Sequence, residues 1–137
     1  MIKKIAIPLI LLLIVSCTKE KAPTVSLQDD VYFLASDSLM GRETGTEYEL
    51  KAAQYIMQRM KDLHLNPAGD SASYYQSFSF KPKKDPHQEV TYVSSDSSIT
   101  GTNIIGYWDN KAESTIIIGA HYDHLGMGGE SSLHRDG

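Results

Sequence analysis

The chain has 137 residues, 41% of them hydrophobic and 22% charged, which is the composition of a globular protein rather than of a disordered one. This length suits one small domain or part of a larger one. The formal net charge is -4 and no basic patch is present in the sequence, so the composition argues against a nucleic-acid partner.

The first 16 residues predict a secretory signal that is removed from the mature protein. Two lysines precede an apolar run from Ile5 to Val15, whose eleven residues are too few to span a bilayer. The run leads into Ile14-Val15-Ser16-Cys17, which resembles a bacterial lipobox, and Cys17 is the only cysteine of the chain. We therefore expect Cys17 to be acylated and to anchor the exported protein on a bacterial membrane, at its periplasmic face or at the cell surface. An ordinary signal peptide with a chance cysteine is the alternative.

Residues 17–25 predict a lipidated tether, and residue 26 begins the part that is expected to fold. Ser26 is followed three residues later by Asp29, a pattern that resembles a capping box and predicts the start of a helix. Apolar side chains then recur on one face at helical spacing, at Leu27, Val31 and Leu34. We expect this helix to end near residues 38–41.

A turn with two glycines, from Gly41 to Thr46, precedes a longer predicted helix. Thr46 and Glu49 complete the Ser/Thr-x-x-Glu pattern of a helix amino terminus. Apolar residues then recur at helical spacing up to His64, and Asn66-Pro67 stops the helix. The methionines of this segment are expected to fill the core rather than to bind a cofactor.

Four strands are predicted after these helices, at residues 74–80, 89–93, 102–108 and 115–120. The last is a run of mostly β-branched apolar residues, so we expect it to form a buried strand. Phe78 and Phe80 share one face of the first strand, and Trp108 is expected to anchor the core or a sheet edge. Helices followed by strands that short turns connect predict an α/β fold, with a mixed β-sheet that is flanked by helices and begins with antiparallel pairs.

His121 and Asp123 follow directly on the last predicted strand. Since side chains alternate along a strand, both can point the same way at its carboxyl end, where ligands and metals usually bind in α/β sheets. A carboxylate beside a histidine suits metal binding, because it fixes the tautomer of the ring. The glycine-rich loop at residues 126–129 suits the rim of an active site. Spacing alone also fits an ordinary surface or core pair, and His124 has the wrong parity to share the face.

Several other catalytic classes are excluded by the sequence. No Gly-x-Ser-x-Gly nucleophile elbow is present, and the only cysteine is taken by the lipobox. The turn from Gly41 to Thr46 lacks the Gly-Lys-Ser/Thr ending of a phosphate loop, and the His-Glu-x-x-His signature of single-zinc peptidases is missing.

The segment around His121 resembles the first metal motif of a known family. Gly119-Ala-His121-Tyr-Asp123-His-Leu-Gly126 is similar to that motif in metallopeptidase family 28, the co-catalytic di-zinc exopeptidases that include bacterial aminopeptidases and the glutamate carboxypeptidase II group. Residues 34–46 resemble the segment before the first long helix of that family. Residues 66–69 and 102–106 resemble further family stretches, so the resemblance covers about residues 26–137 in order.

The resemblance implies a zinc-exopeptidase fold of the phosphorylase/hydrolase-like type, of which residues 26–137 form the amino-terminal part. His121 would bind one of two zinc ions, and Asp123 would be the catalytic-site carboxylate that orients His121 and sets the local electrostatics. The remaining ligands and the general base would follow Gly137, so the chain by itself is expected to be inactive. The residues that would shape the turn and cap the helix are Gly41, Arg42, Gly45 and Thr46.

The implied reaction is hydrolysis of a peptide bond by water that two zinc ions activate, with an aminopeptidase favoured. No residue is assigned to binding of the peptide substrate. Two other interpretations stay open: a non-catalytic surface lipoprotein of the same fold that binds peptides, and a small lipoprotein domain that is complete at Gly137. A glutaminyl-cyclase-like activity, which uses a related fold, is less favoured.

Overall fold

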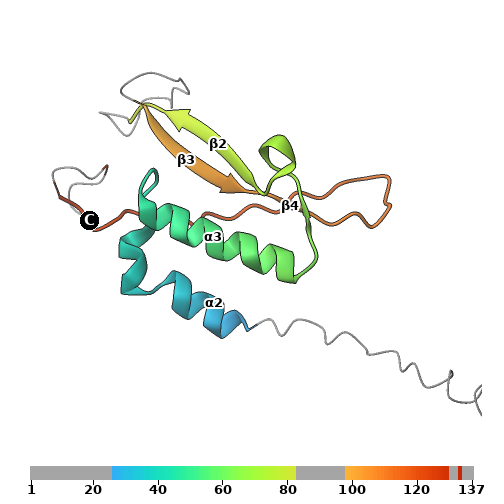
Figure 1. The fold of residues 1–137 in the computed structure, drawn as a ribbon, viewed down its shortest axis with the longest axis horizontal. Helices are drawn as coiled ribbons and strands as arrows, with labels where there is room; N and C mark the ends of the chain where they lie inside the picture. Colours follow the sequence, from blue (N-terminus) through green and yellow to red (C-terminus); the bar gives the residue numbers. More distant parts are fainter. Residues whose placement is uncertain (1–25, 83–97, 130–132, 134–137) are drawn as a thin grey trace, which may run out of the picture.

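The computed structural model describes residues 26–82, 98–129 and 133 of the chain (Figure 1). The predicted signal, Cys17 with its tether, and the predicted strand at 89–93 lie outside the described residues. Helices together with small antiparallel sheets confirm the predicted mixed α/β content. The described elements are, in chain order, α2 (Leu27–Leu34), η2 (Asp37–Arg42), α3 (Glu47–Asp62), β1 (Asn66–Pro67), η3 (Asp70–Ala72), β2 (Tyr75–Phe80), β3 (Ile99–Ile104) and β4 (Gly106–Tyr107).

Helix α2 begins as the sequence predicts. The hydroxyl of Ser26 accepts a hydrogen bond from the backbone N–H of Asp29 at 3.2 Å, which satisfies one of the unpaired donors of the first turn. The helix ends at Leu34, earlier than predicted, because the chain passes there into the 3-10 helix η2. The apolar face predicted at Leu27 and Val31 is exposed.

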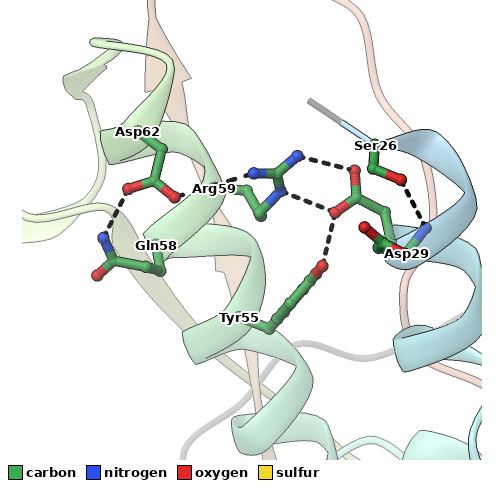
Figure 2. Close-up of a pocket in the computed structure, with 7 residues that line it drawn as sticks. Ser26, Asp29, Tyr55, Gln58, Arg59 and Asp62 are labelled. Atoms are coloured by element: carbon green, nitrogen blue, oxygen red, sulfur yellow. Dashed lines mark hydrogen bonds and ion pairs between the residues drawn. The ribbon is translucent and has the colours of Figure 1, made fainter. Parts of the chain in front are cut away.

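An ion pair and a ring contact join α2 to α3. The carboxylate of Asp30 accepts hydrogen bonds from Arg59 Nε at 2.7 Å and from the Tyr55 hydroxyl at 2.6 Å. Figure 2 shows Tyr55 and Arg59 pointing from α3 toward α2, where they help to line a pocket of about 260 Å³. The ring of Phe33 stacks on that of Tyr55, with 4.1 Å between the centroids. The Arg59 guanidinium, aided by the Tyr55 hydroxyl, holds the pKa of Asp30 below its ordinary value.

Helix α3 begins at the predicted cap. The Thr46 hydroxyl accepts from the Glu49 N–H at 3.3 Å, and the Glu49 carboxylate accepts from the Gly45 N–H at 2.5 Å, one residue before the cap. The other carboxylate oxygen of Glu49 accepts from the N–H of Thr102 in β3 at 2.8 Å. Glu49 is buried. Its two hydrogen bonds join the start of α3 to the sheet, a role that the capping pattern does not predict.

Strands β2 and β3 form an antiparallel pair, with a register that runs from Tyr75 opposite Ile104 to Phe80 opposite Ile99. This pair confirms the strand predicted at residues 74–80, which starts one residue later in the structure. Figure 1 shows α3 lying between α2 and the β2–β3 pair. Helix α3 thus packs with one side on α2 and with another on β3, and it lies between the helical part and the sheet.

The predicted strand at residues 102–108 is divided in two. Strand β3 starts at residue 99, and β4 follows after a break at Ile105. The N–H of Ile105 donates to the Tyr74 carbonyl at 2.8 Å, whereas the carbonyl of Ile105 accepts from the Ala68 N–H at 3.2 Å. The chain therefore changes partners at this residue, and β4 pairs with β1 in a second antiparallel sheet.

The prediction of a buried strand at residues 115–120 is wrong for the described fold. Ile116, Ile117 and Ile118 are 87%, 91% and 91% exposed, and this run is not part of either sheet. A strand needs a neighbouring backbone for its ladder of hydrogen bonds, and no segment within the described ranges pairs with the run. Trp108, expected in the core or at a sheet edge, is also exposed, beyond the end of β4.

The core of the described residues is small. Met60 of α3 packs so closely on Gly106 that a methyl group added to this glycine would overlap the Met60 sulfur. Met57 and Met60 are only half-buried, so the prediction that they fill the core is not confirmed. None of the helices in the described part has the length and the apolar character that crossing a bilayer requires. The buried apolar residues are Leu39, Ala52, Ala53 and Tyr74.

Replacing Glu49 with glutamine tests whether its carboxylate joins α3 to β3. An amide NH₂ group would replace a carboxylate oxygen that faces a backbone N–H, so a buried donor would lose its acceptor. We expect the free energy of unfolding, measured by urea denaturation, to fall by about 2 kcal/mol. Glu47→Gln is the matched control, because Glu47 forms an exposed ion pair with Lys51 whose loss costs less than about 1 kcal/mol. Equal losses in the two variants would contradict this role of Glu49.

Candidate functional site

The segment that carries His121 runs beside the turn that precedes α3. The N–H of His124 donates to the Arg42 carbonyl and the N–H of Gly126 donates to the Gly41 carbonyl, both at 3.0 Å. Glu43 and His124 form an isolated parallel bridge at this point, while the His124 side chain is exposed. Two motifs that lie far apart in the sequence are thereby brought side by side.

The turn itself has a left-handed backbone. The angle φ is 43° at Met40, 71° at Gly41 and 48° at Arg42. A side chain at Gly41 would overlap the backbone of Gly126, so the close approach of the two segments requires glycine there. Met40 and Arg42 lack this freedom, and the contacts around them must hold their conformation. This geometry agrees with the structural role expected for Gly41.

Arg42 ties the turn to the segment of His121. Its Nε donates to the Tyr122 carbonyl at 2.6 Å, and its Nη1 donates to the Leu34 carbonyl at the end of α2. A planar guanidinium presents several N–H groups in fixed directions, so it can hold two acceptors at once. One side chain thus joins α2, the turn and the His121 segment.

His121 and Asp123 point the same way, as their spacing predicts. His121 Nδ1 lies 3.2 Å from Asp123 Oδ1, and Asp123 Oδ2 accepts a hydrogen bond from the Thr44 hydroxyl at 2.8 Å. The His121 side chain is 96% exposed, whereas that of Asp123 is partly covered. With Nδ1 engaged, Nε2 is the ring atom that remains for a ligand. Thr44 was not predicted here, because its contact depends on the pairing of two distant segments.

Tyr122, between these two residues, anchors the segment in the fold. Its hydroxyl donates to the Thr102 carbonyl and lies 3.5 Å from Glu49 Oε1. Burial, followed by the nearby charge of Glu49, raises the pKa of Tyr122 well above its ordinary value. The alternation that puts His121 and Asp123 on one side of an extended segment also predicts that Tyr122 faces the other way. The position of Tyr122 between His121 and Asp123 is therefore a signal in the sequence for this anchoring role.

A cavity of about 450 Å³ opens beside His121 and Asp123. Phe78 and Phe80 of β2 form an apolar part of its wall, and their rings lie 6.0 Å apart at 25°. The common face predicted for these two residues is confirmed. Their position next to His121 follows from the pairing of β2 with β3, which the strand pattern does not define. The other lining residues are Thr44, Glu49, Thr102, Asn103, Ala120 and Tyr122.

The site offers one histidine for a metal ion. Across residues 26–82 and 98–129, no group of three or more His, Cys, Asp or Glu side chains could hold one. His121 with Asp123 fits one zinc ligand and the carboxylate that orients it. A catalytic zinc takes about three protein ligands, so such a site would need donors from outside the described residues.

Comparisons of the chain with protein-family models, with curated proteins and with solved structures found no match. The resemblance to metallopeptidase family 28 therefore stays a prediction. The functional assignment rests on the motif and on the geometry around His121.

Removing the carboxylate of Asp123 should remove the preference of the His121 ring for one tautomer. In the neutral form of the His121 ring, we expect the proton to lie on Nδ1 in the unmodified chain. Asp123→Ala should shift the ring toward the Nε2–H form, which ¹⁵N chemical shifts of the imidazole nitrogens measure. Thr44→Val should give a smaller shift in the same direction and Thr44→Ser none, because serine keeps the hydroxyl. A tautomer that is the same in all four proteins would refute the arrangement.

The raised pKa of Tyr122 should make the fold less stable in alkali. Below about pH 10 the tyrosine is protonated in both states, but above it the unfolded chain loses the proton that the folded chain keeps. The free energy of unfolding should therefore fall as pH rises past about 10, with a slope for this proton of at most about 1.4 kcal/mol per pH unit. Tyr122→Phe should make the measured slope shallower. Tyr107→Phe, at an exposed tyrosine, is the control that should leave the slope unchanged.

Proposed function

We propose that this chain belongs to an exported, lipid-anchored, zinc-dependent exopeptidase of the metallopeptidase family 28 type, with an aminopeptidase favoured. The observation that carries the proposal is that the Asp123 carboxylate accepts a hydrogen bond from the Thr44 hydroxyl with one oxygen and lies 3.2 Å from His121 Nδ1 with the other. Proteins commonly prepare a metal-binding histidine by holding one ring nitrogen with a carboxylate, which fixes the tautomer and raises the basicity of the other nitrogen.

The proposed fold is the mixed sheet flanked by helices of the zinc exopeptidases. It is supported by the backbone hydrogen bonds between residues 34–46 and 119–126, two segments that resemble the family on sequence grounds. The exposed run at residues 115–120 also fits such a sheet, if further strands come from outside the described residues. Burial between them would remove three isoleucine side chains from water.

In the proposed site, His121 would bind zinc through Nε2 while Asp123 keeps the proton on Nδ1. Bound zinc would supply the Lewis acidity that activates water and polarises the carbonyl of a peptide bond. Further ligands and the general base would have to come from residues other than those described. The described residues alone, with His121 as a single imidazole ligand, are therefore expected to bind zinc weakly.

The cavity beside His121 supports a peptide as the substrate. Its wall combines the rings of Phe78 and Phe80 with the polar groups of Thr44 and Asp123. Apolar walls with a few convergent polar groups are typical of sites that bind small organic ligands. A peptide side chain could lie against the phenylalanines while its backbone approaches His121.

A surface lipoprotein that binds peptides without hydrolysing them is the second candidate. The same cavity favours it, because an apolar wall with a few polar groups can hold a peptide without a metal ion. The two candidates share the fold, the anchor and the cavity. Only zinc binding and hydrolysis distinguish them.

The test starts with the coding DNA beyond the codon for Gly137 and uses the protein made from the complete reading frame. Release of amino-terminal residues from short peptides is measured in the presence of zinc, together with bound zinc. We expect His121→Ala to lower kcat/KM by at least about a hundredfold and to reduce bound zinc, because a ligand is lost. Asp123→Ala should lower kcat/KM by about ten- to a hundredfold, as expected for a residue that orients a ligand.

His64→Asn is the matched control for a histidine replacement. His64 is exposed after the end of α3, and its φ of 57° is one that asparagine tolerates. This variant should keep full activity. Hydrolysis that survives His121→Ala would refute the proposed role of His121. Peptide binding by the complete protein without any hydrolysis would favour the second candidate.

A further inference from the structure

Helix α2 exposes an apolar surface at the start of the described fold. Leu27 is 75% exposed, Val31 56% and Tyr32 69%. Leu27 and Val31 lie one turn apart and so share one side of the helix, and Tyr32 flanks them. We refer to these three residues as the α2 apolar face.

The contacts of α2 with α3 fix the direction in which this face points. Asp30 is bonded to Arg59 and Tyr55 of α3, and Phe33 stacks on the Tyr55 ring. Figure 2 shows Arg59 and Tyr55 reaching across to α2 from the neighbouring helix. Because these contacts prevent α2 from rolling, it cannot bury Leu27 and Val31 against α3.

The sequence sets how far α2 can lie from a lipid anchor. Ser26, the cap of α2, is nine residues after Cys17. A fully extended chain spans at most about 3.6 Å per residue, so Ser26 stays within about 30 Å of an acylated Cys17 whatever the conformation of the tether. Tethering at this distance gives a high effective concentration, so that a weak surface contact is enough to orient the protein.

We propose that the α2 apolar face lies on the lipid surface that holds Cys17 and sets the orientation of the domain on it. The inference rests on the lipid anchor included in the proposed function, and it is independent of zinc and of hydrolysis. Two aliphatic side chains can enter the boundary between headgroups and acyl chains, and a tyrosine suits that boundary because its ring is apolar and its hydroxyl polar. Asp30, an acidic residue of the same helix, forms an ion pair with Arg59 on the side toward α3. Its carboxylate therefore need not lose water when the α2 apolar face contacts lipid.

The test uses the mature lipoprotein in vesicles of phosphatidylethanolamine and phosphatidylglycerol. Acylation would consume the thiol of Cys17, the only cysteine, so Val31→Cys provides a single site for an environment-sensitive fluorophore. We expect a blue-shifted emission, strong quenching by nitroxides on the lipids and weak quenching by iodide in the water. Gln54→Cys, at an exposed position of α3, is the matched control and should show the reverse pattern.

Three results would overturn the proposal. The first is a label at position 31 that iodide quenches as strongly as the label at position 54. The second is a label at position 31 that is shielded from iodide but is not reached by the lipid nitroxides, which would assign the α2 apolar face to a contact with protein. The third is a mature chain whose mass shows no acyl groups. None of these measurements involves peptide hydrolysis. A result that overturns the membrane orientation of α2 would therefore leave the zinc-peptidase proposal untouched.

Discussion

The described fold depends on one buried carboxylate, that of Glu49. It accepts hydrogen bonds from the N–H groups of Gly45 and Thr102, and the Tyr122 hydroxyl lies beside it. A buried charge without such partners would be strongly unfavourable, so its three neighbours must stay in place together. These neighbours belong to the start of α3, to β3 and to the segment of His121. The position of the candidate site is therefore coupled to the packing of α3 on the sheet.

Arg42 provides the second connection, and it works through backbone carbonyls. Its guanidinium bonds to the carbonyls of Tyr122 and Leu34, while its own carbonyl accepts from His124. Both sides of the His121 segment are thus held: Tyr122 is fixed from the interior, and the following loop is fixed by the left-handed turn. The His121 ring is left outside these contacts, and Asp123 is the neighbour that orients it. This combination of a rigid backbone and an accessible ring is suited to ligand binding.

Local rules predicted the helices well, because their signals lie within a few residues. The caps at Ser26 and Thr46 were read from side chains that bond to the next turn, and both are confirmed. Long-range features were not predictable in the same way. The second role of Glu49 depends on Thr102, and the approach of Phe78 to His121 depends on strand pairing. The prediction of a buried strand at residues 115–120 is wrong for the same reason. The composition indicates a buried strand, but burial depends on a partner strand that the composition does not specify.

The exposed isoleucines and the candidate site are one continuous segment, which links sheet pairing to ligand binding. Ala120 lines the cavity and directly precedes His121, so any strand that paired with residues 115–120 would also restrict the backbone that carries the imidazole. Such pairing would bury three isoleucines and stabilise the segment by the free energy of transferring them from water. If His121 binds the proposed zinc ion, a ring that is already held in the binding position would bind it more tightly. On the proposed function, pairing of residues 115–120 with another strand should therefore raise the zinc affinity of His121.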